Sequence, residues 1–188
     1  MQAMENAEGE PAGPDVAEYR RVIGGFATGV AVVTSKLGDE PHGMTINSLT
    51  SVSLDPIVVF VALQRGSRTA RAVAEARTFV VNLLDDGQEP LSARFARSGE
   101  DHFVGLELDW TPDGLPVLRG GLGWLSCDVE AADTVGDHLT VLGRVRRVEY
   151  RSGKPLLFFR GKHLSEGRWD LPHHWAELPD DLSALWPA

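Results

Sequence analysis

The sequence predicts a mainly β domain of the α+β class, built as a β-barrel or sandwich with helical excursions. Three observations support this fold class. About six or seven segments of strand length are rich in β-branched residues or alternate between apolar and polar side chains. Few segments have helical periodicity. No GxGxxG motif follows a predicted strand, which argues against a doubly wound dinucleotide-binding sheet.

The predicted strands are separated by turn residues along the chain. Residues 30–36 form a β-branched run, and residues 42–53 form a second extended stretch that ends at Asp55-Pro56. Residues 57–63 are an apolar run of strand length and predict a central strand. Further strands are expected at residues 78–84, 124–132, 139–145 and 156–159.

Three short helices are predicted between these strands. The first covers residues 15–27, where a capping box precedes apolar residues at helical spacing. The second begins at Gly66-Ser67, with Ser67 or Thr69 near its cap, and ends near Glu75. The third covers residues 89–97. Residues 98–117 contain scattered Gly, Pro and Asp and predict a long excursion, which in a compact domain is often functional.

The length of 188 residues suits one domain, expected over residues 15–165. Residues 1–14 are acidic and rich in small side chains, and they predict a disordered leader without the features of a secretory signal. Residues 166–188 predict a Trp- and Pro-rich C-terminal tail. No apolar run approaches the roughly 20 residues of a membrane helix, so no membrane association is expected.

Charge and cysteine content exclude further classes of function. With 18 Lys and Arg against 27 Asp and Glu, the formal net charge of −9 argues against nucleic-acid binding. Cys127 is the only cysteine, which excludes an internal disulfide and argues against a cysteine-based zinc site. We interpret Cys127 as a buried small side chain, predict no metal site, and expect a cytoplasmic location.

Two polar clusters are candidate binding sites. Residues 44–53 carry six short hydrogen-bonding side chains and no Lys or Glu, which suits an uncharged heterocycle and closely approached phosphate oxygens. A Ser/Thr-rich edge strand is an equally good interpretation of this segment. Residues 63–69 place Arg65 and Arg68 at a strand-to-helix junction, where free backbone N–H groups favour anions. A capped, solvated surface helix is the alternative there.

His138 is a third candidate, in the turn sequence Gly136-Asp137-His138. The sequence shows neither a partner for a catalytic triad nor the His and Asp spacing of a metal site. By residue pattern alone, a structural or exposed histidine is therefore the simpler interpretation.

An ordered series of motifs connects these candidates. The motifs are FATGVAVVT (26–34), PHGMTINSLTSVSLDP (41–56), SRT (67–69), FVVNL (79–83), LSARFA (91–96), DHF (101–103), GDH (136–138) and PLLFFRGK (155–162). The series covers about residues 17–164 and resembles the short-chain flavin reductase family, the reductase components of two-component flavin-dependent monooxygenases. The sequence departs from the family pattern at His102, where lysine is common, and at His163, where tyrosine is common. The resemblance implies that both positions line the flavin or nicotinamide pocket.

The resemblance implies a Greek-key split β-barrel of the FMN-binding type with flanking helices. It implies a homodimer with the flavin near the subunit interface. It also implies an oxidoreductase in which NADH or NADPH reduces FMN or FAD by hydride transfer, and the reduced flavin passes to a partner monooxygenase.

The resemblance further implies which residues form the site. His138 is the catalytic candidate and is expected to face the nicotinamide. The stretch 45–48 is expected to line the isoalloxazine, and Ser51, Ser53 and residues 67–69 to hold the phosphate end. The full set of cofactor-binding candidates is Thr45, Ile46, Asn47, Ser48, Ser51, Val52, Ser53, Arg65, Ser67, Arg68, Thr69, Phe103, His138, Phe159 and Gly161.

Two alternatives on the same barrel stay open. One is a flavoprotein that retains FMN and acts on its own organic substrate. The other is a non-enzymatic flavin- or haem-binding module. A plain interaction domain is disfavoured because the two polar clusters occur together.

Overall fold

The computed structural model describes residues 13–99 and 101–164 and confirms a mainly β fold with few helices. The strands of the main sheet are β2 (Ala31–Leu37), β3 (Glu40–Ile46), β4 (Thr50–Leu54), β5 (Ile57–Gln64), β6 (Thr78–Leu83), β9 (Gly123–Val135) and β10 (His138–Tyr150). Apart from residues 13 and 14, the predicted leader over 1–14 and the predicted tail over 166–188 lie outside the described residues.

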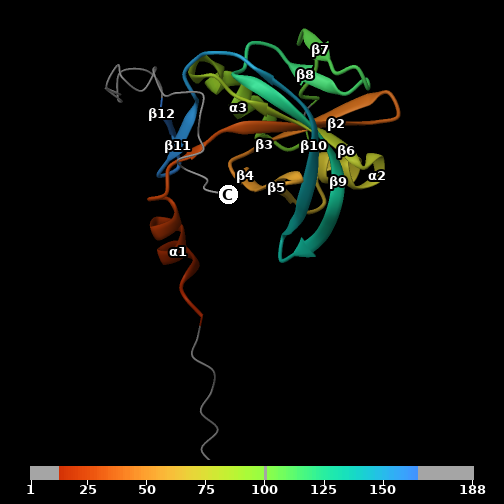
Figure 1. The fold of residues 1–188 in the computed structure, drawn as a ribbon. Helices are drawn as coiled ribbons and strands as arrows, with labels where there is room; N and C mark the ends of the chain where they lie inside the picture. The colour runs from red at the N-terminus through yellow and green to blue at the C-terminus, as the bar shows by residue number, and fades with distance from the viewer. Residues whose placement is uncertain (1–12, 100, 165–188) are drawn as a thin grey trace, which may run out of the picture.

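The main sheet has seven strands in the order β3-β2-β6-β9-β10-β5-β4, and its neighbours pair antiparallel (Figure 1). β5, predicted as a central strand, pairs with β10 on one side and with the edge strand β4 on the other, so it is an interior strand next to the edge of the sheet. β3 and β4 are the two edges, and no ladder joins them within the described residues. The mainly β prediction therefore holds, whereas the sheet order alone does not close a barrel.

Two smaller sheets lie beside the main one. β1 (Thr28–Gly29), β11 (Leu157–Phe159) and β12 (Lys162–Leu164) form a three-stranded sheet. β7 (Leu108–Trp110) and β8 (Pro116–Leu118) form a two-stranded sheet inside the excursion predicted over residues 98–117. Sequence patterns missed β7, β8 and β12, because three-residue strands are too short to show a period.

The helices are α1 (Val16–Ile23), α2 (Arg68–Ala76) and α3 (Glu89–Phe95), with a 3₁₀ turn, η1 (Asp86–Gln88), before α3. The helix predicted over residues 15–27 is wrong at its C-terminus. The amide of Gly25 bonds the carbonyl of Val22 rather than continuing the α-helical pattern, and the helix ends before Gly24. The other two helices agree with the prediction to within two residues.

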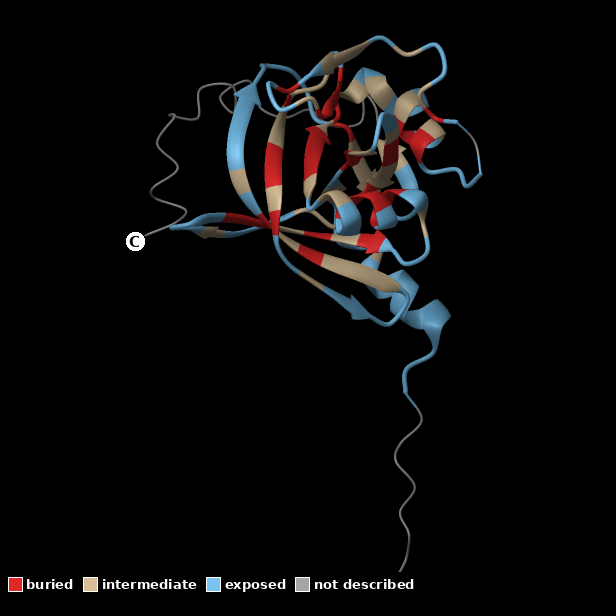
Figure 2. Ribbon diagram, turned by 90° about the vertical axis from the view of Figure 1, so that its right-hand side faces the viewer, coloured by how far each residue is buried: buried red, intermediate tan, exposed pale blue. Residues whose placement is uncertain are grey.

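The main core lies between the sheet and α2. It includes Val61 and Leu63 of β5, Val73 of α2 and Phe79 of β6, all of them fully buried. Figure 2 shows burial concentrated in the strands, whereas α1 has no buried residue. The predicted extended stretch over residues 42–53 is interrupted between β3 and β4, and this interruption brings polar residues next to β5.

A buried amide holds the excursion against the sheet. Asn82 donates to the carbonyl of Val32 (3.0 Å) and to Oγ1 of Thr34 (3.0 Å), and its Oδ1 accepts from the amide of Leu118 (2.9 Å). Each buried polar atom of this side chain therefore has a partner.

Cys127 is buried, as predicted, and burial together with the charge of Asp128 raises the pKa of its thiol to about 12. The thiol therefore stays protonated at neutral pH and is not an active nucleophile. Within the described ranges, no helix combines the length and the apolar character that crossing a membrane requires.

Candidate functional site

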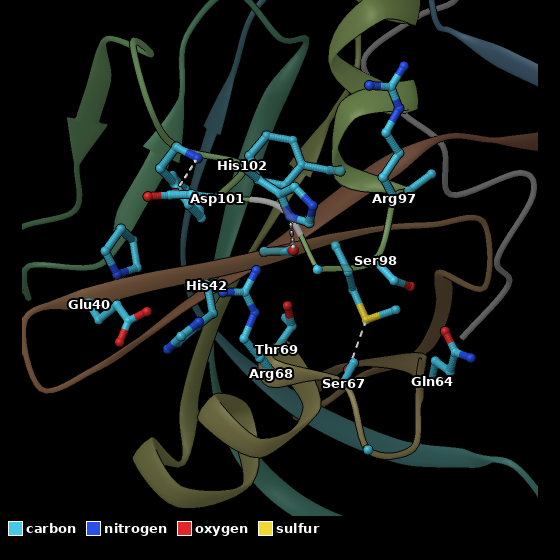
Figure 3. A pocket seen from close by; sticks show the side chains of 18 of the residues that line it. Glu40, His42, Gln64, Ser67, Arg68, Thr69, Arg97, Ser98, Asp101 and His102 are labelled. Atoms are coloured by element: carbon cyan, nitrogen blue, oxygen red, sulfur yellow. Dashed lines mark hydrogen bonds between the residues drawn. The ribbon is translucent and has the colours of Figure 1, made fainter.

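A cavity of about 630 Å³ lies across the open edge of β3 (Figure 3). One wall is the junction between β5 and α2, residues 64–69. The opposite wall consists of residues 95–99 and 101–104, at and after the C-terminal end of α3. We call this space the β3-edge cavity.

The β5–α2 junction has the local structure that its sequence predicts. Gly66 has φ +82°, a left-handed conformation that favours glycine, and it turns the chain from the strand into the helix. Ser67 is the N-cap, and its Oγ accepts from the amide of Ala70 at 3.0 Å. The first turn of α2 therefore faces the cavity with its positive dipole end, and Arg65 and Arg68 line the same space.

The structure brings His138 beside this junction, although it is far away in sequence. His138 is in register with Gln64 across the β10–β5 ladder. The amide of Arg65 donates to the carbonyl of Asp137 at 2.9 Å. The turn before β10 is thus fixed against the rim of the β3-edge cavity.

His138 and Asp137 form a hydrogen-bonded pair, with Nδ1 2.7 Å from Oδ1. The pKa of the Asp137 carboxyl lies below its ordinary value, chiefly because of the hydrogen bond from His138 and then because of the charge of that ring. A carboxylate only accepts, so the pair assigns a hydrogen to Nδ1, and in the neutral tautomer with this arrangement Nε2 is an acceptor. The His138 side chain is 44% exposed, so a ligand can reach it.

A second cavity, of about 1060 Å³, lies between the segment that follows α1 and the sheet. Its lining is mostly apolar and includes Phe26, Leu49, Phe60 and Phe158. We call this space the apolar cavity. Among the described residues, the two cavities have no lining residue in common.

The predicted cofactor-binding residues divide between the two cavities. Arg65, Ser67, Arg68, Thr69 and Phe103 line the β3-edge cavity. Asn47, Ser48 and Gly161 line the apolar cavity. The remaining predicted residues line neither cavity in the described part of the chain; they are Thr45, Ile46, Ser51, Val52, Ser53, His138 and Phe159.

Several hydroxyls in the predicted binding stretch already have backbone partners. Thr45 donates to the carbonyl of Ser92 (2.7 Å), and Ser48 both donates to the carbonyl of Ala62 (3.1 Å) and accepts from its amide (2.9 Å). Ser53 accepts from the amide of Asp55 (3.2 Å). The unusual density of hydroxyls in this segment is thus partly explained by the edge-strand interpretation. Ser53 only accepts in this contact, so its O–H remains available to donate, whereas the O–H of Thr45 is already donated to Ser92.

Ile46 and the β4 residues differ in exposure. Ile46 is 6% exposed and belongs to the main core, so its backbone rather than its side chain can meet a ligand. Ser51 and Val52 are exposed on an edge strand. These β4 side chains are open to a ligand or to another chain.

Two histidines outside the predicted set of cofactor-binding residues line the β3-edge cavity, and both are buried. His42 was missed, whereas His102 was noted as a departure from the family pattern at a pocket position. Figure 3 shows them on opposite sides of the β3 ribbon. The motif series could have indicated both histidines as site residues, since His42 stands in PHGMT and His102 in DHF.

A group that resembles a catalytic triad lies at the other end of α3. His163 places Nε2 3.0 Å from Oγ of Ser92 and Nδ1 3.5 Å from Oε1 of Glu89. Ser92 is fully buried, so no substrate carbon can reach its hydroxyl. We interpret this group as a structural contact that holds β12 against α3.

The features of the two cavities indicate the kind of ligand that the protein binds. A dipolar helix start with two arginines and a neighbouring apolar cavity suit a ligand with one anionic end and one flat apolar ring. The sequence model of the family described as "Flavin reductase like domain" matches residues 23–166, so the chain belongs to this family.

Curated relatives agree with this family. The chain is 40% identical over 151 residues to "FMN reductase (NADH) SmoA" of Agrobacterium fabrum, which covers 80% of this chain and 86% of the relative. It is 35% identical over 177 residues to the flavin-dependent monooxygenase reductase subunit HsaB of Mycobacterium tuberculosis, which covers 91% of this chain and 92% of the relative.

Solved structures agree as well. Flavin reductase PheA2 in its native state superposes with a TM-score of 0.75 at 35% identity, over 81% of this chain and 98% of that one. The Streptomyces globisporus NADH:FAD oxidoreductase SgcE6, in complex with NAD and FAD fragments, superposes with a TM-score of 0.78 at 33% identity, over 88% of this chain and 99% of that one.

Proposed function

We propose that this protein is an NADH-dependent flavin reductase that supplies reduced flavin to the monooxygenase component of a two-component system. The observation that carries the proposal is the family match over residues 23–166, together with relatives named as an NADH-linked FMN reductase and as a monooxygenase reductase subunit. The anion-attracting junction beside β3 supports it independently, because FMN and FAD both carry phosphate.

The residues of this chain bind and orient, because hydride transfer from the nicotinamide to the flavin is chemistry that the two ligands supply. Arg68, Ser67 and Thr69 hold the phosphate end of FMN or FAD at the start of α2. Asn47 and Ser48 contact the isoalloxazine at the apolar cavity. β3 and the residues that follow it run between the two regions, since Met44 lines the β3-edge cavity and Asn47 lines the apolar cavity.

A test of the reaction crosses NADH and NADPH against riboflavin, FMN and FAD in a steady-state assay. Flavin-stimulated oxidation of NADH is the expected result, with NADPH the weaker donor. If no flavin stimulates nicotinamide oxidation above background, the proposal is wrong. Gel filtration then separates the alternatives, because stoichiometric retention of FMN favours a flavoprotein with its own substrate.

The protein functions as a homodimer with the flavin near the subunit interface, and a split β-barrel closes around the site. Support comes from α1, whose Val16, Tyr19, Val22 and Ile23 are all exposed. Figure 1 shows α1 standing away from the sheets. Together with exposed Phe26, these side chains leave an apolar surface next to the apolar cavity, which a second copy covers.

Replacing Val22 by glutamate should shift the protein from dimer to monomer. A charge on the apolar face of α1 is buried without a partner when the second copy docks. Light scattering at micromolar concentration measures the mass, against 20.4 kDa for one chain. Arg21→Glu, one residue earlier on the same exposed helix, is the matched control and should stay dimeric. A dimeric Val22→Glu would place the interface elsewhere.

His138 positions the nicotinamide. With Nδ1–H held by Asp137, its Nε2 accepts a hydrogen bond from the carboxamide N–H of NADH. His138→Ala should therefore raise the KM for NADH about 10-fold and leave flavin affinity nearly unchanged. Separate NADH and flavin titrations measure the two effects. Unchanged kinetics would mean that His138 only caps its turn, and lost flavin binding would place it in the flavin pocket.

A cytoplasmic location fits this reaction. NADH is available there, and a lone thiol such as that of Cys127 stays reduced in that compartment.

A further inference from the structure

One buried hydroxyl at the apolar cavity has no hydrogen-bond partner. Thr28 lies on β1 and lines this cavity. The residue as a whole is half-buried, whereas its Oγ1 is shielded from solvent and has no donor or acceptor within residues 13–99 and 101–164. A buried hydroxyl normally has a partner, because an unpaired one has lost its hydration without replacement. The described chain therefore leaves the Thr28 hydroxyl unsatisfied.

The backbone at Thr28 is held on β11. Thr28 pairs with Phe158 in the β1–β11 ladder, and the amide of Val30 donates to the carbonyl of Leu156 at 3.0 Å. The Cβ of Thr28 is thus fixed in place, and the side chain retains rotation between staggered positions about one bond. Since Oγ1 makes no hydrogen bond, that rotation breaks none. The hydroxyl can therefore turn toward a ligand in the apolar cavity.

The hydroxyls that the resemblance assigned to the isoalloxazine cannot donate to it. The O–H of Thr45 is donated to the carbonyl of Ser92 at 2.7 Å, and the O–H of Ser48 is donated to the carbonyl of Ala62 at 3.1 Å. A hydroxyl has one hydrogen, so neither can also donate to a ligand. Thr28, in contrast, has an O–H that no described group accepts.

The other side chains of the lining with available donors differ from Thr28 in exposure. They are Arg20, Asn47, Thr50 and Arg160, and all four residues are exposed. A donor that is already in water exchanges one hydrogen bond for another when a ligand binds, whereas a shielded and unpaired donor gains one. A ligand acceptor in this cavity therefore gains most from Thr28.

We propose that Thr28 is a flavin-binding residue, whose Oγ1–H donates to an acceptor atom of the isoalloxazine ring in the apolar cavity. The inference rests on the proposed function for the position of that ring. The isoalloxazine suits the cavity, because it is flat and largely apolar and carries carbonyl oxygens and ring nitrogens as acceptors. The contact supplies a polar anchor that fixes how the ring lies among apolar side chains.

Replacing Thr28 by valine should change stability and binding in opposite directions. Valine has nearly the same shape and suits a strand equally well, but it has no hydroxyl to leave unpaired. Without flavin, Thr28→Val should melt about 2–4 °C higher than the unmodified chain. It should also bind flavin about 3- to 10-fold more weakly, the loss expected for one neutral hydrogen bond. Scanning calorimetry and fluorescence titration measure the two effects.

Three flavins and a second variant identify the contact. Riboflavin, FMN and FAD share the isoalloxazine and differ in their phosphates, so Thr28→Val should weaken all three by the same factor. Thr28→Ser retains the hydroxyl. It should bind the three flavins within about twofold of the unmodified chain, and it should not show the higher melting temperature.

Thr140→Val is the matched control. Thr140 is a half-buried threonine in a strand, as Thr28 is, but its Oγ1 donates to the carbonyl of Asp133 at 2.9 Å and it lines neither cavity. This variant should lose stability rather than gain it, because it removes a hydrogen bond that the protein makes. Its affinity for the three flavins should equal that of the unmodified chain.

Several outcomes would overturn the inference and leave the reductase function intact. Unchanged flavin affinity in Thr28→Val, equal weakening in Thr28→Ser, or a loss confined to FMN and FAD would each exclude the ring contact. A lower melting temperature of Thr28→Val, or its failure to fold, would mean that Oγ1 has a partner within the protein. A changed mass in light scattering would place that partner in a second copy. If the unmodified chain neither binds nor reduces any of the three flavins, the proposed function fails, and the inference fails with it.

Discussion

Arg68→Ala should weaken the binding of FAD and FMN about 10- to 150-fold, which corresponds to a charge-assisted hydrogen bond of about 1.5–3 kcal/mol. Arg68 is the first residue of α2 and lines the β3-edge cavity, where the phosphate end is proposed to bind. Riboflavin carries no phosphate, so its affinity should change little. Fluorescence titration of the three flavins measures the effect.

Arg71→Ala is the matched control for this prediction. Arg71 lies one turn further along α2, pairs with Glu75 at 2.8 Å, and does not line the cavity. Exposed helix ion pairs contribute only about 0.3–0.5 kcal/mol, so flavin affinity should be nearly unchanged. If Arg68→Ala weakens all three flavins equally, the arginine contacts the ring or acts through the fold.

Gly143→Val should destabilise the fold by about 3 kcal/mol or more. A Cβ at this position of β10 would lie 2.4 Å from Cζ of Phe79 and 3.1 Å from Cβ of Cys127. Phe79 is fully buried in the main core and cannot move aside without disturbing its neighbours. Chemical denaturation monitored by circular dichroism measures the loss in the free energy of unfolding.

Gly29→Ala separates steric overlap from the general effect of replacing a strand glycine. Gly29 lies in β1, and a Cβ there meets nothing within 4 Å. The expected change is within about 0.5 kcal/mol. Equal losses in the two variants would mean that overlap with Phe79 is not the cause.

Local signals in the sequence were sufficient wherever the structure is set by neighbouring residues. Ser67 and Thr69 were the two candidates for the N-cap of α2, and Ser67 is the cap, because its hydroxyl accepts from an amide only three residues away. The apolar run of β5 and the alternation of β10 also appear as strands, since burial of one or both faces determines their pattern.

Contacts between residues that are far apart in the sequence could not be predicted from it. The hydroxyls of Ser48 and Thr45 were interpreted as ligand donors, but their partners lie 14 and 47 residues away and are invisible to pattern analysis. The sequence also could not show that the predicted site residues divide between two cavities. The reason is that the positions of α1 and α3 relative to β3 follow from tertiary packing. His102 required the structure, since only the contact with Gly43 shows which of its nitrogens is unsatisfied.

The backbone hydrogen bond from Arg65 to Asp137 joins two parts of the proposed site. One end belongs to the junction where the flavin phosphates are proposed to bind, and the other belongs to the turn that carries His138. A shift of that junction on flavin binding would reach the proposed nicotinamide position through this bond and through the adjoining pairing of His138 with Gln64. Thermodynamic reciprocity then requires that NADH alter flavin affinity by the same factor by which flavin alters NADH affinity. The size of this mutual effect would then depend on the turn that carries His138 as well as on the two proposed binding regions.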